Sequence, residues 1–239
     1  MTTVPSVAEI AAQIDHAILK PELTRDDVDA DLDLAREYGI FSVCVRPSDV
    51  AHAVARLAGS TVAVGTVIGF PHGTTTTQTK VAEARQALED GALELDMVLN
   101  IGRLRSGLVE DVEADIRAVK RAAGDHVVKV ILETALLDDG QKVAACEAAE
   151  RAGADFVKTS TGFAGGGATL EDVRLMRAAV GPGVQVKASG GVRGLDTLLE
   201  MRDAGVTRFG TSATRVILDD LAARVAGGQA TGAEDSTSY

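Results

Sequence analysis

Residues 141–161 read QKVAACEAAERAGADFVKTST, and they contain the helix-then-strand unit that decides the fold. Ala, Glu and Arg dominate Gln141–Ala152, which predicts a helix. Gly153 follows directly and suits the left-handed residue that closes a helix. The next run, Asp155–Thr161, concentrates Phe, Val and Thr, which is typical of a short buried strand.

The same unit recurs on both sides of this stretch. Eight short apolar and β-branched runs, each bounded by Gly, Pro or polar residues, predict strands at Ile14–Leu19, Phe41–Val45, Val62–Phe70, Ala92–Leu99, Val127–Glu133, Asp155–Thr161, Val184–Ser189 and Arg208–Thr211. Helical spacing lies between them, for example at Thr76–Glu89, Gly107–Ala123 and Leu170–Val180. Further helix ends are expected at Asp90-Gly91 and Ala204-Gly205.

Regular alternation of strand and helix implies parallel strands joined by crossover helices, and eight such units can close a barrel. An open doubly wound sheet is the alternative, but no Gly-x-Gly-x-x-Gly follows the first strand, where a dinucleotide-binding sheet would carry it. We therefore predict an α/β protein with a single (β/α)8 TIM barrel over residues 1–226. Residues 227–239 are rich in Gly, Ser and Thr and are predicted to form a flexible C-terminal tail.

Composition and net charge restrict the classes of molecule that this protein is expected to bind. The chain of 239 residues is 46% hydrophobic and 25% charged, which is ordinary for a soluble globular protein. A net charge of -11 disfavours binding to nucleic acid or to anionic membranes. No apolar run approaches the roughly 20 residues that span a bilayer, and the first residues do not resemble a secretory signal. With only Cys44 and Cys146, both in apolar segments, we expect a cytoplasmic protein.

Four ionisable residues interrupt the predicted strands four to seven, namely Asp96, Lys129, Lys158 and Lys187. Charges inside barrel strands are costly unless they serve the C-terminal end of the barrel. Period-two alternation in Leu93–Val98 places the leucines toward the helices and Asp96 toward the interior.

Three lysines that converge inside a barrel repel each other and are poorly solvated, and both effects lower an ammonium pKa. A neutral lysine attacks an aldehyde or ketone to give an iminium ion, which is an electron sink for breaking the adjacent carbon–carbon bond. Asp96 would then move protons or orient a water molecule. A purely structural ion-pair network is the alternative, and the spacing alone does not select one lysine as the nucleophile.

Six segments carry a family resemblance. They run in order along nearly the whole chain and are Ile14–Pro21, Val67–Gly73, Glu94–Val98, Lys129–Thr134, Asp155–Phe163 and Val186–Arg193. Together they resemble the deoxyribose-phosphate aldolase family. The resemblance implies reversible cleavage of 2-deoxy-D-ribose 5-phosphate to acetaldehyde and D-glyceraldehyde 3-phosphate, with no metal and no other cofactor.

The resemblance also assigns roles. Lys158 matches the Schiff-base lysine, Lys187 the second lysine that keeps it deprotonated, and Asp96 the carboxylate of the proton relay. Asp15 and Lys129 are left with supporting roles. The implied partners are a small phosphorylated sugar and aldehydes, and a homodimer is a further expectation.

Barrels often hold phosphate on the loops after strands seven and eight, where backbone N–H groups at a helix start face the anion. Those loops, with the one after strand six, give the candidates Gly162, Gly190, Gly191, Arg193, Gly210 and Ser212. Two departures weaken the family pattern. Ala17 stands where Thr is usual, and Phe163 stands where some members contact the phosphate with lysine. The run Gly165–Gly167 is interpreted as a loop.

Tyr239 ends the chain. A terminal tyrosine on a mobile segment usually has no role, but some members of the family bring such a hydroxyl into the site. We therefore expect Tyr239 to be an acid–base group tethered by a flexible linker.

Three other functions remain as alternatives. A metal-dependent aldolase would need paired metal ligands, whereas His16, His52, His72 and His126 lie on separate elements. A transaldolase-like enzyme would lack this set of motifs. A sugar-phosphate sensor would keep the phosphate loop but lose the lysine pair or Asp96, and both are present.

Overall fold

Eight parallel strands close into a barrel in the computed structural model, which describes residues 5–229 and 232–235. The strands are β1 (Ile14–Ile18), β2 (Ser42–Val45), β3 (Ala63–Ile68), β4 (Glu94–Val98), β5 (Val127–Ile131), β6 (Phe156–Lys158), β7 (Gln185–Ser189) and β8 (Arg208–Thr211). Each strand pairs with the next along the chain, and β8 pairs with β1. The predicted TIM barrel is confirmed.

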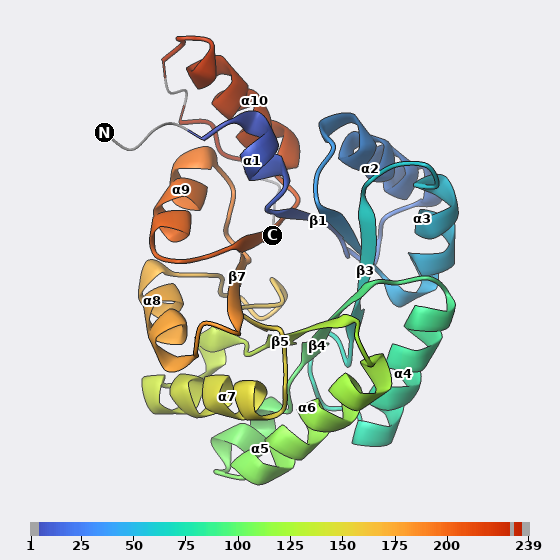
Figure 1. The fold of residues 1–239 in the computed structure, drawn as a ribbon, viewed down its shortest axis with the longest axis vertical. Helices are drawn as coiled ribbons and strands as arrows, with labels where there is room; N and C mark the ends of the chain where they lie inside the picture. Colours follow the sequence, from blue (N-terminus) through green and yellow to red (C-terminus); the bar gives the residue numbers. More distant parts are fainter. Residues whose placement is uncertain (1–4, 230–231, 236–239) are drawn as a thin grey trace.

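Helices surround the barrel (Figure 1). They are α1 (Val7–Ala11), α2 (Arg25–Tyr38), α3 (Val50–Arg56), α4 (Thr77–Glu89), α5 (Ile101–Arg105), α6 (Val109–Ala123), α7 (Asp139–Arg151), α8 (Leu170–Ala179), α9 (Leu195–Asp203) and α10 (Thr214–Val225), with short 3-10 turns at Pro47–Asp49 and Thr134–Leu136. Along the described parts of the chain, no helix is both long and apolar enough to cross a membrane.

Several strands end earlier than the sequence predicts. β3 ends at Ile68 because Gly69 turns the chain with a φ of 62°, and β5 ends before Glu133, whose φ is 60°. β6 ends at Lys158, although Thr159–Thr161 also reads as strand. The residues beyond these ends form loops at the barrel mouth, which is where a TIM barrel carries its active site.

The helix boundaries follow local chemistry. Gly91, Gly153 and Gly205, which follow α4, α7 and α9, have φ values of 100°, 86° and 104°, so the predicted left-handed glycines are confirmed. Helix α7 begins two residues before the predicted Gln141, because Asp138 caps it and Gln141 reaches back to the Asp138 backbone.

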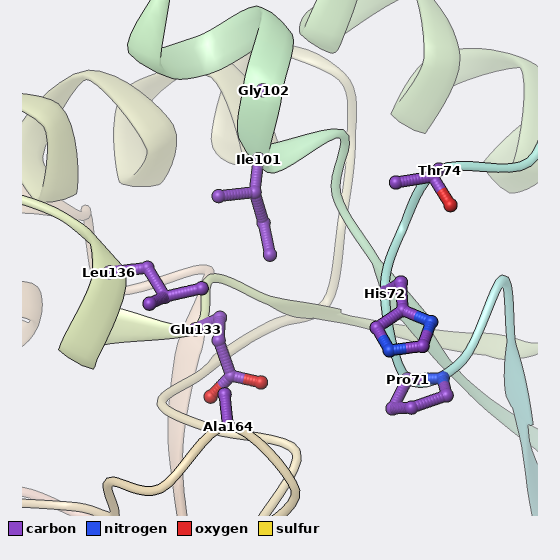
Figure 2. A pocket seen from close by; sticks show the side chains of 8 residues that line it. All are labelled: Pro71, His72, Thr74, Ile101, Gly102, Glu133, Leu136 and Ala164. Carbon is purple, nitrogen blue, oxygen red and sulfur yellow. The ribbon is translucent and has the colours of Figure 1, made fainter.

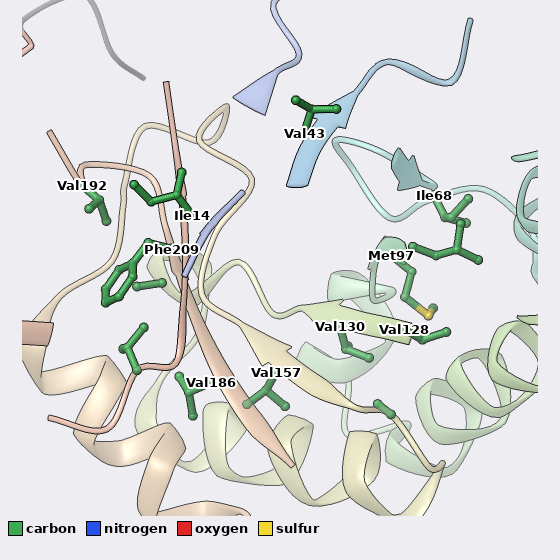
Figure 3. Close-up of a cluster of buried hydrophobic side chains, with 14 of the residues drawn as sticks. Ile14, Val43, Ile68, Met97, Val128, Val130, Val157, Val186, Val192 and Phe209 are labelled. Atoms are coloured by element: carbon green, nitrogen blue, oxygen red, sulfur yellow. The ribbon is translucent and has the colours of Figure 1, made fainter. Parts of the chain in front are cut away.

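The hydrophobic core lies between the strands and the helices. Figure 3 shows outward side chains from several strands in this layer, among them Met97, Val128, Val157, Val186 and Phe209, all fully buried. Leu95 also packs there, but Leu93 does not: it precedes β4 and is 52% exposed, so that part of the prediction was wrong. Because the apolar core lies outside the barrel strands, the strand positions that face the barrel interior can carry charged side chains.

Part of the C-terminal segment lies against the loop after β7. Glu234 forms an antiparallel bridge with Gly194, and the Asp235 N–H donates to the Arg193 carbonyl at 3.0 Å. The segment at residues 232–235 therefore reaches the barrel end that carries the predicted phosphate loop.

Candidate active site

Seven charged side chains meet inside the barrel. Six strands contribute them, and even Arg208, the most exposed, is only 8% exposed. They are Asp15, Glu94, Asp96, Lys129, Lys158, Lys187 and Arg208. Strand register brings them together, because Asp96 pairs with Lys129 on β5 and Lys158 pairs with Lys187 on β7.

Asp96 is bonded to all three lysines. Its Oδ2 accepts from Lys158 Nζ at 2.8 Å and from Lys187 Nζ at 2.7 Å, while its Oδ1 accepts from Lys129 Nζ at 2.9 Å. Burial disfavours the Asp96 carboxylate, but the three ammonium groups outweigh burial and hold its pKa well below the usual range. Asp96 is therefore held in its ionised form.

Asp15 is a second carboxylate that accepts hydrogen bonds from several of the buried cations. Its Oδ2 accepts from Lys187 at 2.5 Å and Lys129 at 3.1 Å, and its Oδ1 accepts from Arg208 at 2.8 Å and from the Ser42 hydroxyl at 2.6 Å. Each oxygen of this fully buried carboxylate thus has two donors, as a buried charge requires. The predicted supporting residue fixes Lys187.

Lys158 differs from the other lysines in its partners. In the described part of the chain, Asp96 is the one carboxylate within ion-pair distance of Lys158, whereas Lys187 has two and Lys129 has three. Burial lowers the pKa of Lys158, Asp96 opposes that shift, and the Lys187 charge adds to it. The net direction is downward, which favours the neutral amine.

The other two lysines shift the opposite way. Burial disfavours the ammonium groups of Lys187 and Lys129, but the neighbouring carboxylates outweigh it and raise both pKa values. The expectation that crowding lowers all three pKa values was therefore wrong for two of them. The reason is that Lys129 lies within ion-pair distance of three carboxylates and Lys187 within ion-pair distance of two.

The charge balance explains the special position of Lys158. When Lys158 is left out, three cations of the cluster face three carboxylates. The cations are Lys129, Lys187 and Arg208, and the carboxylates are Asp15, Glu94 and Asp96. A protonated Lys158 would add a fourth positive charge in a buried site, which is costly. A neutral Lys158 leaves the cluster balanced.

Glu94 and Arg208 belong to this cluster, although neither was predicted as a site residue. Glu94 Oε2 accepts from Lys129 at 2.6 Å and from Arg208 at 3.3 Å. Glu94 lies two residues before Asp96 on β4, so period-two alternation is the signal that could have placed it on the same face. Cys44 also lies near these charges, and burial raises the pKa of its thiol to about 11.

A cavity of about 280 Å³ opens among the loops after β6 and β7, lined by Gly162, Gly165, Gly166, Gly167, Gly191 and Arg193. Gly162 and Gly191 have φ values of 87° and 76°, a backbone conformation that glycine adopts without strain. The Arg193 Nε is buried without a partner among the described residues. Helix α9 begins next to it at Leu195, and its N-cap residue Gly194 makes no side-chain cap.

The other predicted phosphate contacts are placed differently. Gly190 lies behind the cavity, where its carbonyl accepts from Ala168 N–H at 2.9 Å. Gly210 lies inside the barrel, because a Cβ there would sit 3.1 Å from Lys187 Cε and against the Ser189 hydroxyl. Ser212 is half-buried just before α10 and does not line the cavity.

A second cavity of about 300 Å³ opens over the loops after β3 to β6. Figure 2 shows its lining side chains, which are Pro71, His72, Thr74, Ile101, Gly102, Glu133, Leu136 and Ala164. Nearby, the Phe163 ring packs edge-on against Phe70 with centroids 5.3 Å apart. Phe163 therefore contacts another aromatic ring at the position where some family members have lysine.

The remaining residues singled out in the sequence take no part in the buried ion pairs of the barrel interior. His16 Nδ1 contacts the Thr214 hydroxyl at 2.8 Å, and His126 Nδ1 contacts the Ala123 carbonyl at 2.9 Å. Ala17 packs in a small apolar cluster with Cys44 and Val67. Over the described residues, no group of three His, Cys, Asp or Glu side chains is arranged to hold a metal ion. Tyr239 lies outside the described residues.

The chain is similar to aldolases in both sequence and fold. The family model described as DeoC/LacD family aldolase matches residues 10–219. A deoxyribose-phosphate aldolase of Staphylococcus haemolyticus (strain JCSC1435) is 56% identical over 208 residues, covering 87% of this chain and 94% of the relative. A solved tetrameric deoxyribose phosphate aldolase from Aeropyrum pernix superposes with a TM-score of 0.83 at 32% identity, covering 92% of this chain and 93% of that one.

Proposed function

This chain belongs to the DeoC/LacD family of aldolases, and we propose that its Lys158 forms the Schiff base of a deoxyribose-phosphate aldolase reaction. The reaction is the reversible cleavage of 2-deoxy-D-ribose 5-phosphate to acetaldehyde and D-glyceraldehyde 3-phosphate, which makes the enzyme a carbon–carbon lyase. The observation that supports Lys158 most directly is its position as the barrel lysine with a lowered pKa and a single carboxylate partner.

The proposed cycle begins when neutral Lys158 Nζ attacks C1 of the open-chain sugar. Loss of water gives an iminium ion, and the C3 hydroxyl gives up its proton as the C2–C3 bond breaks. The electron pair of that bond moves into the iminium to form an enamine, and D-glyceraldehyde 3-phosphate leaves. A proton returns to C2, and hydrolysis releases acetaldehyde and free Lys158.

Asp96 is the proposed proton relay, because its Oδ2 lies 2.8 Å from Lys158 Nζ, where these transfers occur. Lys187 disfavours protonation of Lys158 and neutralises Asp96. Asp15 and Lys129 support the site indirectly, since Asp15 holds Lys187 and Lys129 holds the second oxygen of Asp96. No metal or other cofactor has a step in this cycle.

The substrate phosphate is proposed to occupy the cavity lined by Gly162, Gly191 and Arg193, which adjoins the start of α9. Gly190 would shape this cavity from behind, and Ser212 would add a hydroxyl from the loop before α10. Gly210 would act differently, by leaving room for the Lys187 side chain.

Two further proposals concern the cellular location and the oligomeric state of the enzyme. We propose a cytoplasmic enzyme, which the two buried free thiols of Cys44 and Cys146 support. We also propose a homodimer, although the Aeropyrum pernix relative is described as a tetramer.

The direct test is to measure turnover of 2-deoxy-D-ribose 5-phosphate, then reduce the enzyme with borohydride in the presence of acetaldehyde and map the adduct by mass spectrometry. We expect turnover and one ethyl adduct on Lys158. Borohydride without acetaldehyde is the control. An adduct on another lysine, or none, would reject the assignment.

The Tyr239 proposal has its own test. Removing Tyr239, or Tyr239→Phe, should lower kcat by roughly 100-fold, the lower range for losing a general acid or base. The melting temperature of each variant is the control, and an unchanged value separates loss of catalysis from unfolding. Unchanged kinetics in both variants would show that Tyr239 is a plain terminus.

A further inference from the structure

Glu133 stands out at the end of β5. It is the one residue other than glycine with a positive φ in the described structure, at 60°, and it is 1% exposed. Such a backbone conformation is uncommon for a residue with a side chain, and it persists where surrounding contacts fix it. The catalytic cycle proposed above gives Glu133 no role, although it lies in one of the six family segments.

The Glu133 carboxylate is bonded to a single residue of the next loop. Its two oxygens lie 3.2 and 3.3 Å from the Thr161 N–H, and Oε2 also accepts from the Thr161 hydroxyl. Burial raises the pKa of Glu133, and the Thr161 bonds oppose that shift. The Thr161 hydroxyl oxygen in turn accepts from Phe163 N–H at 3.0 Å. The buried carboxylate thus holds Thr161, and Thr161 in turn holds the backbone of Phe163 two residues further along the loop.

This loop forms most of the wall of the 280 Å³ cavity. It leaves β6 at Lys158 and reaches α8, and between them Gly162 and the run Gly165–Gly167 line the cavity. Glycines have no side chains with which to hold the loop in place, and each can adopt many backbone conformations. The loop is tied at its far end, where Ala168 N–H donates to the Gly190 carbonyl at 2.9 Å. Glu133 ties it at the near end.

We propose that Glu133 is a positioning residue, which fixes the loop between Lys158 and Ala168 so that the backbone at Gly162 meets the phosphate of the substrate. The inference rests on the proposed function. Glu133 acts through Thr161 and does not touch the reacting atoms. Loss of the Glu133 carboxylate should therefore weaken binding of the substrate phosphate and leave Schiff-base formation at Lys158 intact.

The test compares two substrates, 2-deoxy-D-ribose 5-phosphate and 2-deoxy-D-ribose, which differ only in the phosphate. For Glu133→Ala we expect kcat/KM on the phosphorylated sugar to fall about 10- to 100-fold, mostly through KM, as for loss of a hydrogen bond to a charged group. On the unphosphorylated sugar the change should stay within about threefold. Borohydride trapping with acetaldehyde should still label Lys158.

Conservative variants keep the test informative if Glu133→Ala folds poorly. Glu133→Gln should retain part of the phosphate-dependent activity, because its amide oxygen can still accept from the Thr161 N–H. Thr161→Val removes the hydroxyl at nearly constant volume, and Thr161→Ser restores it. The double variant Glu133→Gln/Thr161→Val should lose little more than the stronger single variant, because both changes break one contact.

Two results would overturn the proposal. One is an equal loss on both sugars, and the other is an additive loss in the double variant. Neither result would touch the aldolase assignment, which depends on turnover and Lys158 labelling by the unaltered enzyme.

Discussion

Replacing Lys158 with alanine should lower kcat/KM for 2-deoxy-D-ribose 5-phosphate by roughly four orders of magnitude or more, the scale of removing a nucleophile. The amine supplies the covalent intermediate, and no other described lysine has both a lowered pKa and a place in the barrel interior. Steady-state kinetics and borohydride labelling measure the loss, and the label should disappear with the activity.

The fold should survive this change. Removal of the Lys158 side chain leaves three cations facing three carboxylates, so no carboxylate of the cluster loses its last cation. Lys142→Met is a matched control, because Lys142 pairs with Asp139 and Asp172 outside the barrel and should keep full activity and labelling. A Lys158→Ala variant that retains more than a small fraction of turnover would contradict the nucleophile assignment.

Lys187→Leu should abolish activity near neutral pH by a different route. Removing that ammonium takes away a charge that disfavours protonation of Lys158, and it leaves Asp15 and Asp96 short of a cation. Both effects raise the pKa of Lys158. Each unit of increase lowers the neutral fraction about tenfold at pH values below that pKa.

The pH profile of kcat/KM should change in a defined direction in the Lys187→Leu variant. With a higher pKa, Lys158 becomes neutral only at higher pH, so the acidic limb of the kcat/KM profile should move upward in pH. We expect at least roughly 100-fold less activity at pH 7, with partial recovery as the pH is raised toward the new pKa. The measurement is kcat/KM across pH for both proteins.

Loss of a buried ion pair also destabilises a protein, by about 3–5 kcal/mol, so stability needs its own control. Lys80→Met provides it, because Lys80 is a fully buried lysine of α4 that pairs with Asp115 of α6 at 2.6 Å and also donates to the Val98 carbonyl, apart from the charges inside the barrel. This variant should melt at a lower temperature with an unchanged pH profile. A Lys187→Leu profile that keeps its acidic limb would reject the coupling between the two lysines.

Much of the fold could be predicted from local pattern. Strand-helix alternation, with glycine after helices such as the one that ends before Gly153, is written in neighbouring residues, so eight strands and their order were predicted correctly. Period-two alternation likewise placed Asp96 inside the barrel. These features depend on side-chain spacing within one element, which a sequence records directly.

Closure of the barrel decided the contacts between residues that are far apart in the sequence. Asp15 on β1 meets Lys187 on β7 across 172 positions of sequence, and only the pairing of β8 with β1 brings them together. Glu133 reaches Thr161 only because β5 and β6 are neighbours that end side by side. The sequence by itself determined the barrel and the inward position of Asp96. Tertiary structure decided that carboxylates surround Lys187 and Lys129 while Lys158 has one, because opposite charges on distant strands set each pKa through distances that no local spacing contains.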